Sequence, residues 1–279
     1  MLESRILIIM LLSILFSLFV NAQTPPVATN TTKNSTATPN PAVWSLGLGL
    51  EYSENVAQVE DGPKESGMEL AFTPGYVIND TFALSGAFSM IQMSTEDKKP
   101  MSSNTQVGLS MKGWDITKSI KTVHGATAVL PTSQTSREID KLHSSIGISN
   151  GLKMTLHPKF ELTYRLGLTR NFHEFTINAN GSANVEYRLA NTINMKLIAT
   201  EKLNLTATGV YRLGRTYEGF QRSDFQFHGD INYDILDNLS VNLGSSNEGA
   251  ALKANGVDSN ISVYDEKSTV WRVGISTSI

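Results

Sequence analysis

The chain has 279 residues, of which 40% are hydrophobic, a formal net charge of −3 and no cysteine. The near-neutral charge argues against a nucleic-acid partner. The lack of cysteine excludes disulfides, thiolate metal sites and lipid attachment to a cysteine after a leader. Beyond the first twenty-odd residues no stretch is apolar enough for a membrane helix. A transmembrane barrel stays open, because its strands mix apolar and polar residues.

The N-terminus predicts an exported protein. Arg5 precedes the apolar run ILIIMLLSILFSLFV, and the small residues before Gln23 suit cleavage, so residues 1–22 read as a signal peptide. An uncleaved anchor is the alternative, but the run is short for a membrane span. Residues 23–42 are rich in Thr, Asn, Pro and Ser with almost nothing to bury. We expect them to form a disordered leader and a candidate plug.

From Trp44 onward the chain shows no sustained helical period, and apolar residues alternate with polar ones in segment after segment. The expected strands are 45–53, 68–78, 82–93, 105–114, 119–130, 143–156, 159–169, 183–199, 203–214, 224–235, 239–245 and 268–279. The segment at 119–130 alternates poorly, so its register is loosely predicted.

The segment KFELTYRLGLTRN, residues 159–171, shows the alternation most clearly. Phe160, Leu162, Tyr164, Leu166 and Leu168 share one face, and polar residues and glycine occupy the other. A soluble sandwich turns such an apolar face toward its core, whereas a membrane barrel turns it toward lipid.

The connections favour the barrel. Short turns at 79–80, 157–158, 201–202 and 237–238 are separated by longer polar stretches at 54–66, 94–104, 131–141, after Asn171, 215–222 and 247–267. Short and long connections alternate, as they do in barrels with short periplasmic turns and long extracellular loops. We therefore predict an all-β fold over residues 43–279, an antiparallel transmembrane β-barrel of about 12 strands.

Aromatic residues on the apolar parity support a membrane setting. They gather near both strand ends, as two bilayer interfaces would select: Trp44, Tyr76, Phe82, Phe160 and Tyr233 near the turns, and Tyr52, Tyr187, Tyr211 and Phe225 near the loops. The final run VWRVGISTSI resembles the C-terminal strand of bacterial outer-membrane barrels, although Ile279 replaces the usual terminal aromatic residue. The resemblance implies the bacterial outer membrane, with its lipids and lipopolysaccharide, and barrel-assembly machinery that reads the C-terminal strand.

On this register the inner wall carries small residues, which leave space for water in a barrel of intermediate width. It also carries the charged residues expected to line a pore: Glu51, Glu69, Lys112, Lys153, Glu161, Arg165, Glu186, Arg188, Lys196, Arg212, Asp224, His228, Asp230, Asp234 and Arg272. Hairpin geometry predicts three pairs: Lys153 with Glu161, Arg212 with Asp224, and Arg165 with Glu186. Such pairs could brace the wall, or line a permeation path and set weak ion selectivity.

The sequence predicts a porin-like channel for passive diffusion of small hydrophilic solutes, with no enzyme activity, cofactor or metal. The balanced charge argues against the arginine-rich track of the twelve-strand channels for acidic sugars. Two alternatives remain, a surface-interaction barrel that acts through its loops and a phospholipase-like enzyme. His143 and Ser145 loosely resemble the His-x-Ser element of outer-membrane phospholipase A, but their parity points them into the lumen.

Overall fold

The computed structural model describes residues 44–56, 65–94, 100–253 and 255–279. The predicted signal peptide (1–22) and leader (23–42) lie outside the described residues and stay predictions. Among the described residues, no helix has both the length and the apolar character needed to cross a membrane.

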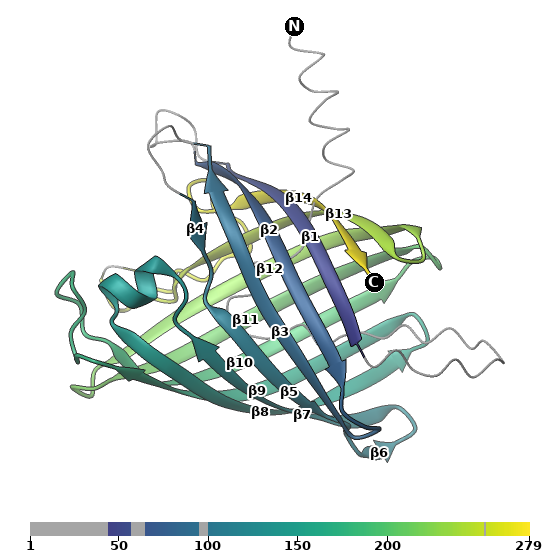
Figure 1. Ribbon diagram of the computed structural model, residues 1–279, viewed down its shortest axis with the longest axis horizontal. Coiled ribbons are helices and arrows are strands. Elements are labelled where there is room, and N and C mark those ends of the chain that lie inside the picture. Colours follow the sequence, from purple (N-terminus) through teal and green to yellow (C-terminus); the bar gives the residue numbers. More distant parts are fainter. Residues whose placement is uncertain (1–43, 57–64, 95–99, 254) are drawn as a thin grey trace, which may run out of the picture.

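The described chain forms one antiparallel sheet that closes on itself as a barrel (Figure 1). Its wall has twelve strands, each paired with the next along the chain. They are β1 (Trp44–Asn55), β2 (Ser66–Val77), β3 (Phe82–Met93), β5 (Thr105–Met111), β7 (Ile120–Leu130), β8 (Leu142–His157), β9 (Phe160–His173), β10 (Val185–Ile198), β11 (Leu203–Thr216), β12 (Gln221–Leu236), β13 (Leu239–Ala250) and β14 (Val270–Ser278). Two short strands, β4 (Met101–Ser102) and β6 (Asp115–Thr117), pair with β3 and β7.

The barrel closes between its first and last strands. β1 pairs with β14 from Gly47 opposite Ser278 to Asn55 opposite Val270. Leu46 and Ile279 exchange two backbone hydrogen bonds of 2.9 and 3.0 Å at the short-turn end. Closure leaves no free sheet edge, which is the condition for a sheet to span a bilayer.

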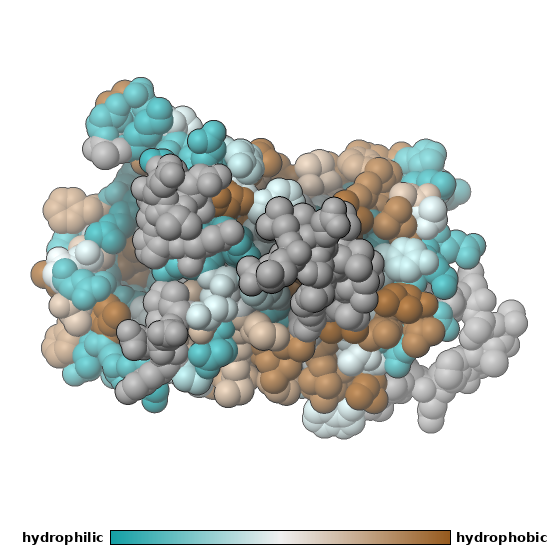
Figure 2. Space-filling view, turned by 90° about the horizontal axis from the view of Figure 1, so that it is seen from above, coloured by the Kyte–Doolittle hydropathy of each residue, from teal (hydrophilic) through white to brown (hydrophobic). Residues whose placement is uncertain are grey.

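The two faces of the wall are the reverse of those in a soluble protein. In β8, Ile146 and Ile148 are 54% and 60% exposed, whereas Ser145 is 4% exposed. Among the described residues, sixteen buried side chains are polar or charged and five are hydrophobic. Figure 2 shows hydrophobic residues mostly over the middle and right of one face, with hydrophilic residues dominating the left end. The leucines of residues 159–171 are therefore on the outside, where lipid would lie.

Most connections alternate in length as predicted, and the exceptions have structural causes. The polar stretch 215–222 is a tight turn, because β11 and β12 extend into it and Gly219 adopts a φ of +90°. The strand expected at 105–114 ends earlier, at Met111, and a separate short strand, β6, begins at Asp115. Most other wall strands match their predicted ranges, and several continue further into the loop ends.

One aromatic residue predicted to belong to the outer belts, Phe225, is buried. Phe225 is 3% exposed, although it lies on the outward parity. The segment after β13 folds back here. The side-chain amide of Asn260 donates a hydrogen bond to the backbone oxygen of Ala250, and its backbone N–H donates to that of Ala251. Phe225 also lies near Gly249 and packs on Phe227. Trp44 keeps its expected position at the turn end, 70% exposed and 4.4 Å from Tyr76 between ring centroids.

Candidate functional site in the lumen

Apart from Lys153 on β8 and Lys112 after β5, the charged residues of the predicted lining belong to strands on one side of the barrel, from β9 through β14 to β1 and β2. The inward positions of β3, β5, β7 and β8 are mostly small and neutral, such as Ser85, Ala87, Gly108, Ser110, Gly147 and Ser149. Long charged side chains on one side therefore face short neutral ones on the other. One side of the lumen is thus charged, and the other side is mostly uncharged.

Arg272 on β14 is the centre of the charged side. Its Nη2 lies 3.0 Å from Oδ1 of Asp230, and its Nη1 lies 4.0 Å from Oε2 of Glu51. The Arg272 and Glu51 side chains are 5% and 1% exposed, so these charges attract each other with little screening by water. Glu69 lies opposite Glu51 on β2 and adds a second carboxylate beside the cluster.

The pair between Asp230 and Arg272 depends on a glycine. Gly244 on β13 lies in register between Asp230 on β12 and Arg272 on β14. A Cβ at this position would lie 2.1 Å from Asp230 Oδ1. The carboxylate therefore reaches across β13 through the space that a side chain would fill.

A second group of inward side chains lies on β10, β11 and β12. Arg212 Nη1 lies 2.6 Å from Oδ1 of Asp224, which confirms the predicted pair. Its Nη2 donates to the side-chain oxygen of Gln226. Arg188 lies on the neighbouring strand β10, and His228 follows Gln226 on the inward parity of β12. His228 is 7% exposed, so its side chain is packed among its neighbours on the inner wall.

The short-turn end of the lumen holds a third group. Lys153 Nζ lies 3.0 Å from Oε2 of Glu161, as predicted, and Lys196 lies opposite Glu161 in register. Arg165 lies between Gly151 and Thr192, and the described residues place no acidic group within ion-pair distance of it.

Asp234 lies at the same end of the barrel. It lines a cavity of about 240 Å³ together with residues of the β12–β13 turn and of β1, β2, β13 and β14, among them Gly47, Thr73, Ser240 and Ser276.

Two predicted pore residues lie apart from these three groups. Glu186 forms a 3.0 Å ion pair with Arg170, and the Arg170 guanidinium lies over the rings of Phe172 and Tyr187. The prediction that Glu186 pairs with Arg165 is wrong, because a bulge between Val185 and Tyr187 changes the local parity of β10. Lys112 is exposed in the break between β5 and β6.

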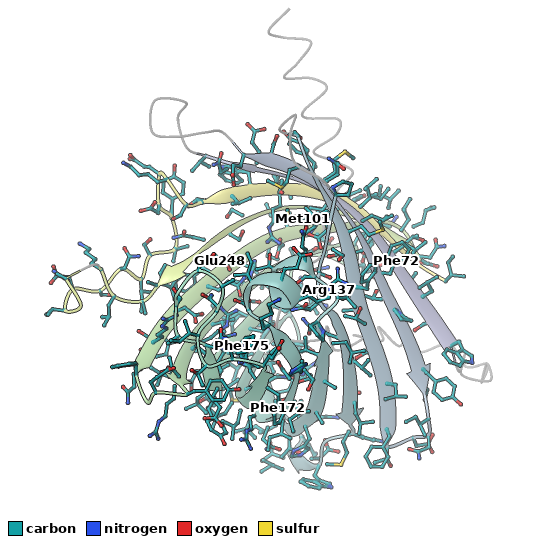
Figure 3. The ribbon with its side chains drawn as sticks, turned by 60° about the vertical axis from the view of Figure 1, so that its left-hand side comes forward. Phe72, Met101, Arg137, Phe172, Phe175 and Glu248 are labelled. Atoms are coloured by element: carbon teal, nitrogen blue, oxygen red, sulfur yellow. The ribbon has the colours of Figure 1, made fainter. Side chains whose placement is uncertain are left out.

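The long-loop end of the lumen is partly covered. One turn of π-helix, η2 (Thr135–Ile139), lies across the opening and carries Arg137, as Figure 3 shows. Asn104 donates to the Ser136 hydroxyl over 2.8 Å, and the backbone N–H of Ala179 donates to Ile139 O over 2.9 Å. These bonds hold the 131–141 loop between two other connections.

Sequence reasoning missed the neutral polar residues of the lumen. Gln226 and Asn242 are 3% and 5% exposed and share the inward parity of their strands with charged residues or glycine. Their inward parity can be read from the sequence, but a neutral amide carries no charge that marks it as a luminal residue.

Solved structures with a similar fold include outer-membrane channels and porins. The COG4313 outer membrane channel from Pseudomonas putida F1 matches with a TM-score of 0.57 and 9% identity, covering 89% of this chain and 100% of that one. The NanC porin matches with a TM-score of 0.54 and 8% identity, covering 83% and 98%. The KdgM porin, in complex with disordered oligogalacturonate, matches with a TM-score of 0.52 and 9% identity, covering 84% and 99%. No family model and no curated protein matches the sequence.

The structure combines a closed barrel, an apolar outer wall and a polar lumen, and these three features together identify its class of fold. The chain has the fold of a twelve-stranded β-barrel of the bacterial outer membrane. Its structural neighbours are channels of porin type, and at such low identity the likeness extends to the fold alone.

Proposed function

We propose that the protein is a narrow outer-membrane channel through which small hydrophilic solutes diffuse passively, with weak ion selectivity. The observation that carries this proposal is a closed barrel whose interior is polar and nearly balanced in charge. Without Glu186 and Lys112, the proposed lining among the described residues has six acidic and six basic side chains, besides His228. A balanced lining gives ions of neither sign a strong advantage.

The same residues support a small conductance. Glu51, Arg272 and His228 are each less than one-tenth exposed, so these inward side chains are packed together and leave little of their own surface to water. The η2 turn narrows the opening at the long-loop end (Figure 3). A twelve-stranded barrel also encloses less area than the sixteen-stranded porins.

The charge balance favours small neutral or zwitterionic solutes over acidic sugars. One structural neighbour is a porin in complex with an oligogalacturonate. In this chain Asp230 and Asp224 each hold an arginine in an ion pair, and Glu51 lies 4.0 Å from Arg272. These carboxylates would compete with an anionic solute for the same guanidinium groups.

Arg165→Glu in planar bilayers tests the permeation path. The expected result is a reversal potential shifted toward cations, because the change replaces a luminal positive charge with a negative one where screening is weak. Arg170→Glu is the matched control, since it makes the same charge change beside Phe172 and Tyr187 on the outer wall. Equal shifts in both variants, or none in either, would contradict the proposed path.

A second candidate function, interaction through the loops, is favoured by exposed apolar side chains on the connections at the long-loop end. Phe175, Ile177 and Phe220 are 55%, 51% and 67% exposed. A folded barrel that passes no current would bring this function forward. The phospholipase alternative at His143 and Ser145 gains no support, because the Ser145 hydroxyl donates to Asn171 Oδ1 over 2.7 Å.

A further inference from the structure

Three polar side chains form a hydrogen-bonded chain on the outer wall. Thr122 Oγ1 lies 2.8 Å from Nε2 of His124, and His124 Nδ1 lies 2.7 Å from Oδ1 of Asn150. The amide oxygen of Asn150 can only accept, so the shared proton belongs on Nδ1. Nε2 then accepts the hydrogen bond of the Thr122 hydroxyl. A hydroxyl, a basic nitrogen and a group that fixes the tautomer are the three parts of an activated nucleophile.

The position of this chain sets it apart from ordinary polar pairs. His124 lies opposite Met111 on β5 and Asn150 on β8, and Asn150 shares its parity with the exposed Ile146 and Ile148. The group therefore faces lipid and not the lumen. Polar and ionisable side chains on a lipid-facing surface are energetically unfavourable, and where they occur they mark candidate functional sites.

The break between β5 and β6 shapes the site around Thr122. The backbone N–H of Trp114 donates to Thr122 Oγ1 over 2.8 Å, and the Trp114 ring lies 4.7 Å from the His124 ring between centroids. Only glycine fits at 113, because a Cβ there would lie 1.5 Å from the Thr122 carbonyl oxygen. Such irregularities in strands often aim side chains at active sites.

The surroundings suit a lipid. Trp114 is 64% exposed near the short-turn end, the interfacial depth that tryptophan prefers. Beyond His124 the next two outward residues of β7 are Ala126 and Ala128, before Leu130 ends the strand. They lie between Leu109 and Val107 on β5 and Ile148 and Ile146 on β8. This strip of small residues between larger aliphatic ones would accept a hydrocarbon chain that leads away from the hydroxyl.

We propose that Thr122, His124 and Asn150 form a site that hydrolyses the acyl esters of phospholipids in the periplasmic leaflet. Thr122 Oγ1 attacks the ester carbonyl and passes its proton to His124 Nε2, which returns it to the leaving alcohol oxygen as the ester C–O bond breaks. Water then attacks the acyl-threonine, His124 again carries the proton, and a fatty acid leaves while the threonine hydroxyl is restored. Asn150 holds the ring in the required tautomer and is a positioning residue.

The test uses the full-length protein, folded in vesicles of phosphatidylethanolamine and phosphatidylglycerol. Fatty-acid release is measured, together with covalent capture by a long-chain alkyl fluorophosphonate mapped by peptide mass spectrometry. We expect capture at Thr122, loss of both signals in Thr122→Val and retention of both in Thr122→Ser. Asn150→Leu should lower the rate of fatty-acid release by about 10²-fold, because His124 would lose the partner that fixes its tautomer.

Thr127→Val is the matched control, because Thr127 lies on the same strand with its side chain toward the lumen, beside Gly147. It should leave release and capture unchanged, and heat modifiability on gels confirms that each variant is folded. The proposal is overturned if folded wild-type protein shows no capture at Thr122. It is overturned equally if Thr122→Val releases fatty acid as fast as wild type does. Neither result would bear on the channel proposal.

Discussion

The pair between Asp230 and Arg272 predicts a strong effect of a small change, Gly244→Ala. The added methyl group would stand 2.1 Å from Asp230 Oδ1 and 3.0 Å from the backbone oxygen of Gly229. Ordinary van der Waals contact begins at 3.4 Å, so the carboxylate must retreat by about 1.3 Å. Because Gly244 lies in register between the two partners, we expect this retreat to lengthen their 3.0 Å separation and break the ion pair.

The free-energy change follows from burial. The side chains of Arg272 and Asp230 are 5% and 19% exposed, so water replaces little of the lost interaction. Breaking a buried pair destabilises a protein by about 3–5 kcal/mol, and we expect about 3 kcal/mol, the low end. Glu51 justifies the low end, because it lies 4.0 Å from Arg272 and would still offset part of its charge.

Gly229→Ala is the control, because a Cβ at that position of β12 meets nothing within 4 Å. Denaturant unfolding of the barrel in vesicles, followed by tryptophan fluorescence, should show a much lower midpoint for Gly244→Ala than for Gly229→Ala. If the two variants unfold together, the carboxylate does not depend on the space at Gly244, and the description of the cluster is wrong.

Four further predictions concern the wall, the topology, a surface pair and a loop. Ile148→Arg should destabilise the barrel by about 2–4 kcal/mol at midplane depth, whereas the inward Thr163→Arg should cost less than half of that in the same unfolding assay. An epitope tag at Lys253 should be detected on intact cells, and one at Asp237 only after the outer membrane is breached. The reverse labelling pattern would show that the orientation of the barrel in the membrane is opposite to the one predicted. A double-mutant cycle on Lys153 and Glu161, which are 36% and 26% exposed, should give a coupling of about 0.5–1 kcal/mol. The backbone N–H of Lys267 and the hydroxyl of Ser268 lower the pKa of Asp265, so its hydrogen bonds are kept above the ordinary aspartate pKa and lost as the pH falls through the lowered value. The protection factor of the Ser268 amide, its exchange rate relative to that of an unprotected amide at the same pH, should fall in that range and stay constant near neutrality.

The fold was predictable because successive side chains in a strand point to opposite faces of the sheet. The position of a residue in the alternating pattern therefore fixes its face. One change of face escaped prediction at Glu186. The bulge between Val185 and Tyr187 alters the parity of β10 over a single residue, and no sequence signal marks it. Once Glu186 leaves the lumen side, its 3.0 Å partner is Arg170, about 17 Å along β9 from the predicted Arg165.

The candidate sites were harder to predict than the fold. Lys153 and Glu161 belong to one hairpin, so turn geometry was enough to pair them. Asp230 and Arg272 lie two strands apart, and their contact depends on the space at Gly244. The Thr122 site was missed for another reason. Ala126 and Ala128 give the outward parity of β7 little apolar contrast, so the face of His124 could not be assigned from alternation.

The most direct test of the central claim is the current that the purified, full-length protein passes in planar bilayers. The account predicts small, discrete conductance steps with a reversal potential near zero in a salt gradient, because acidic and basic side chains line the lumen in near balance. A heat-modifiable, correctly folded barrel that inserts and passes no current would contradict it. The loops and the outer wall would then be the remaining places to look for function.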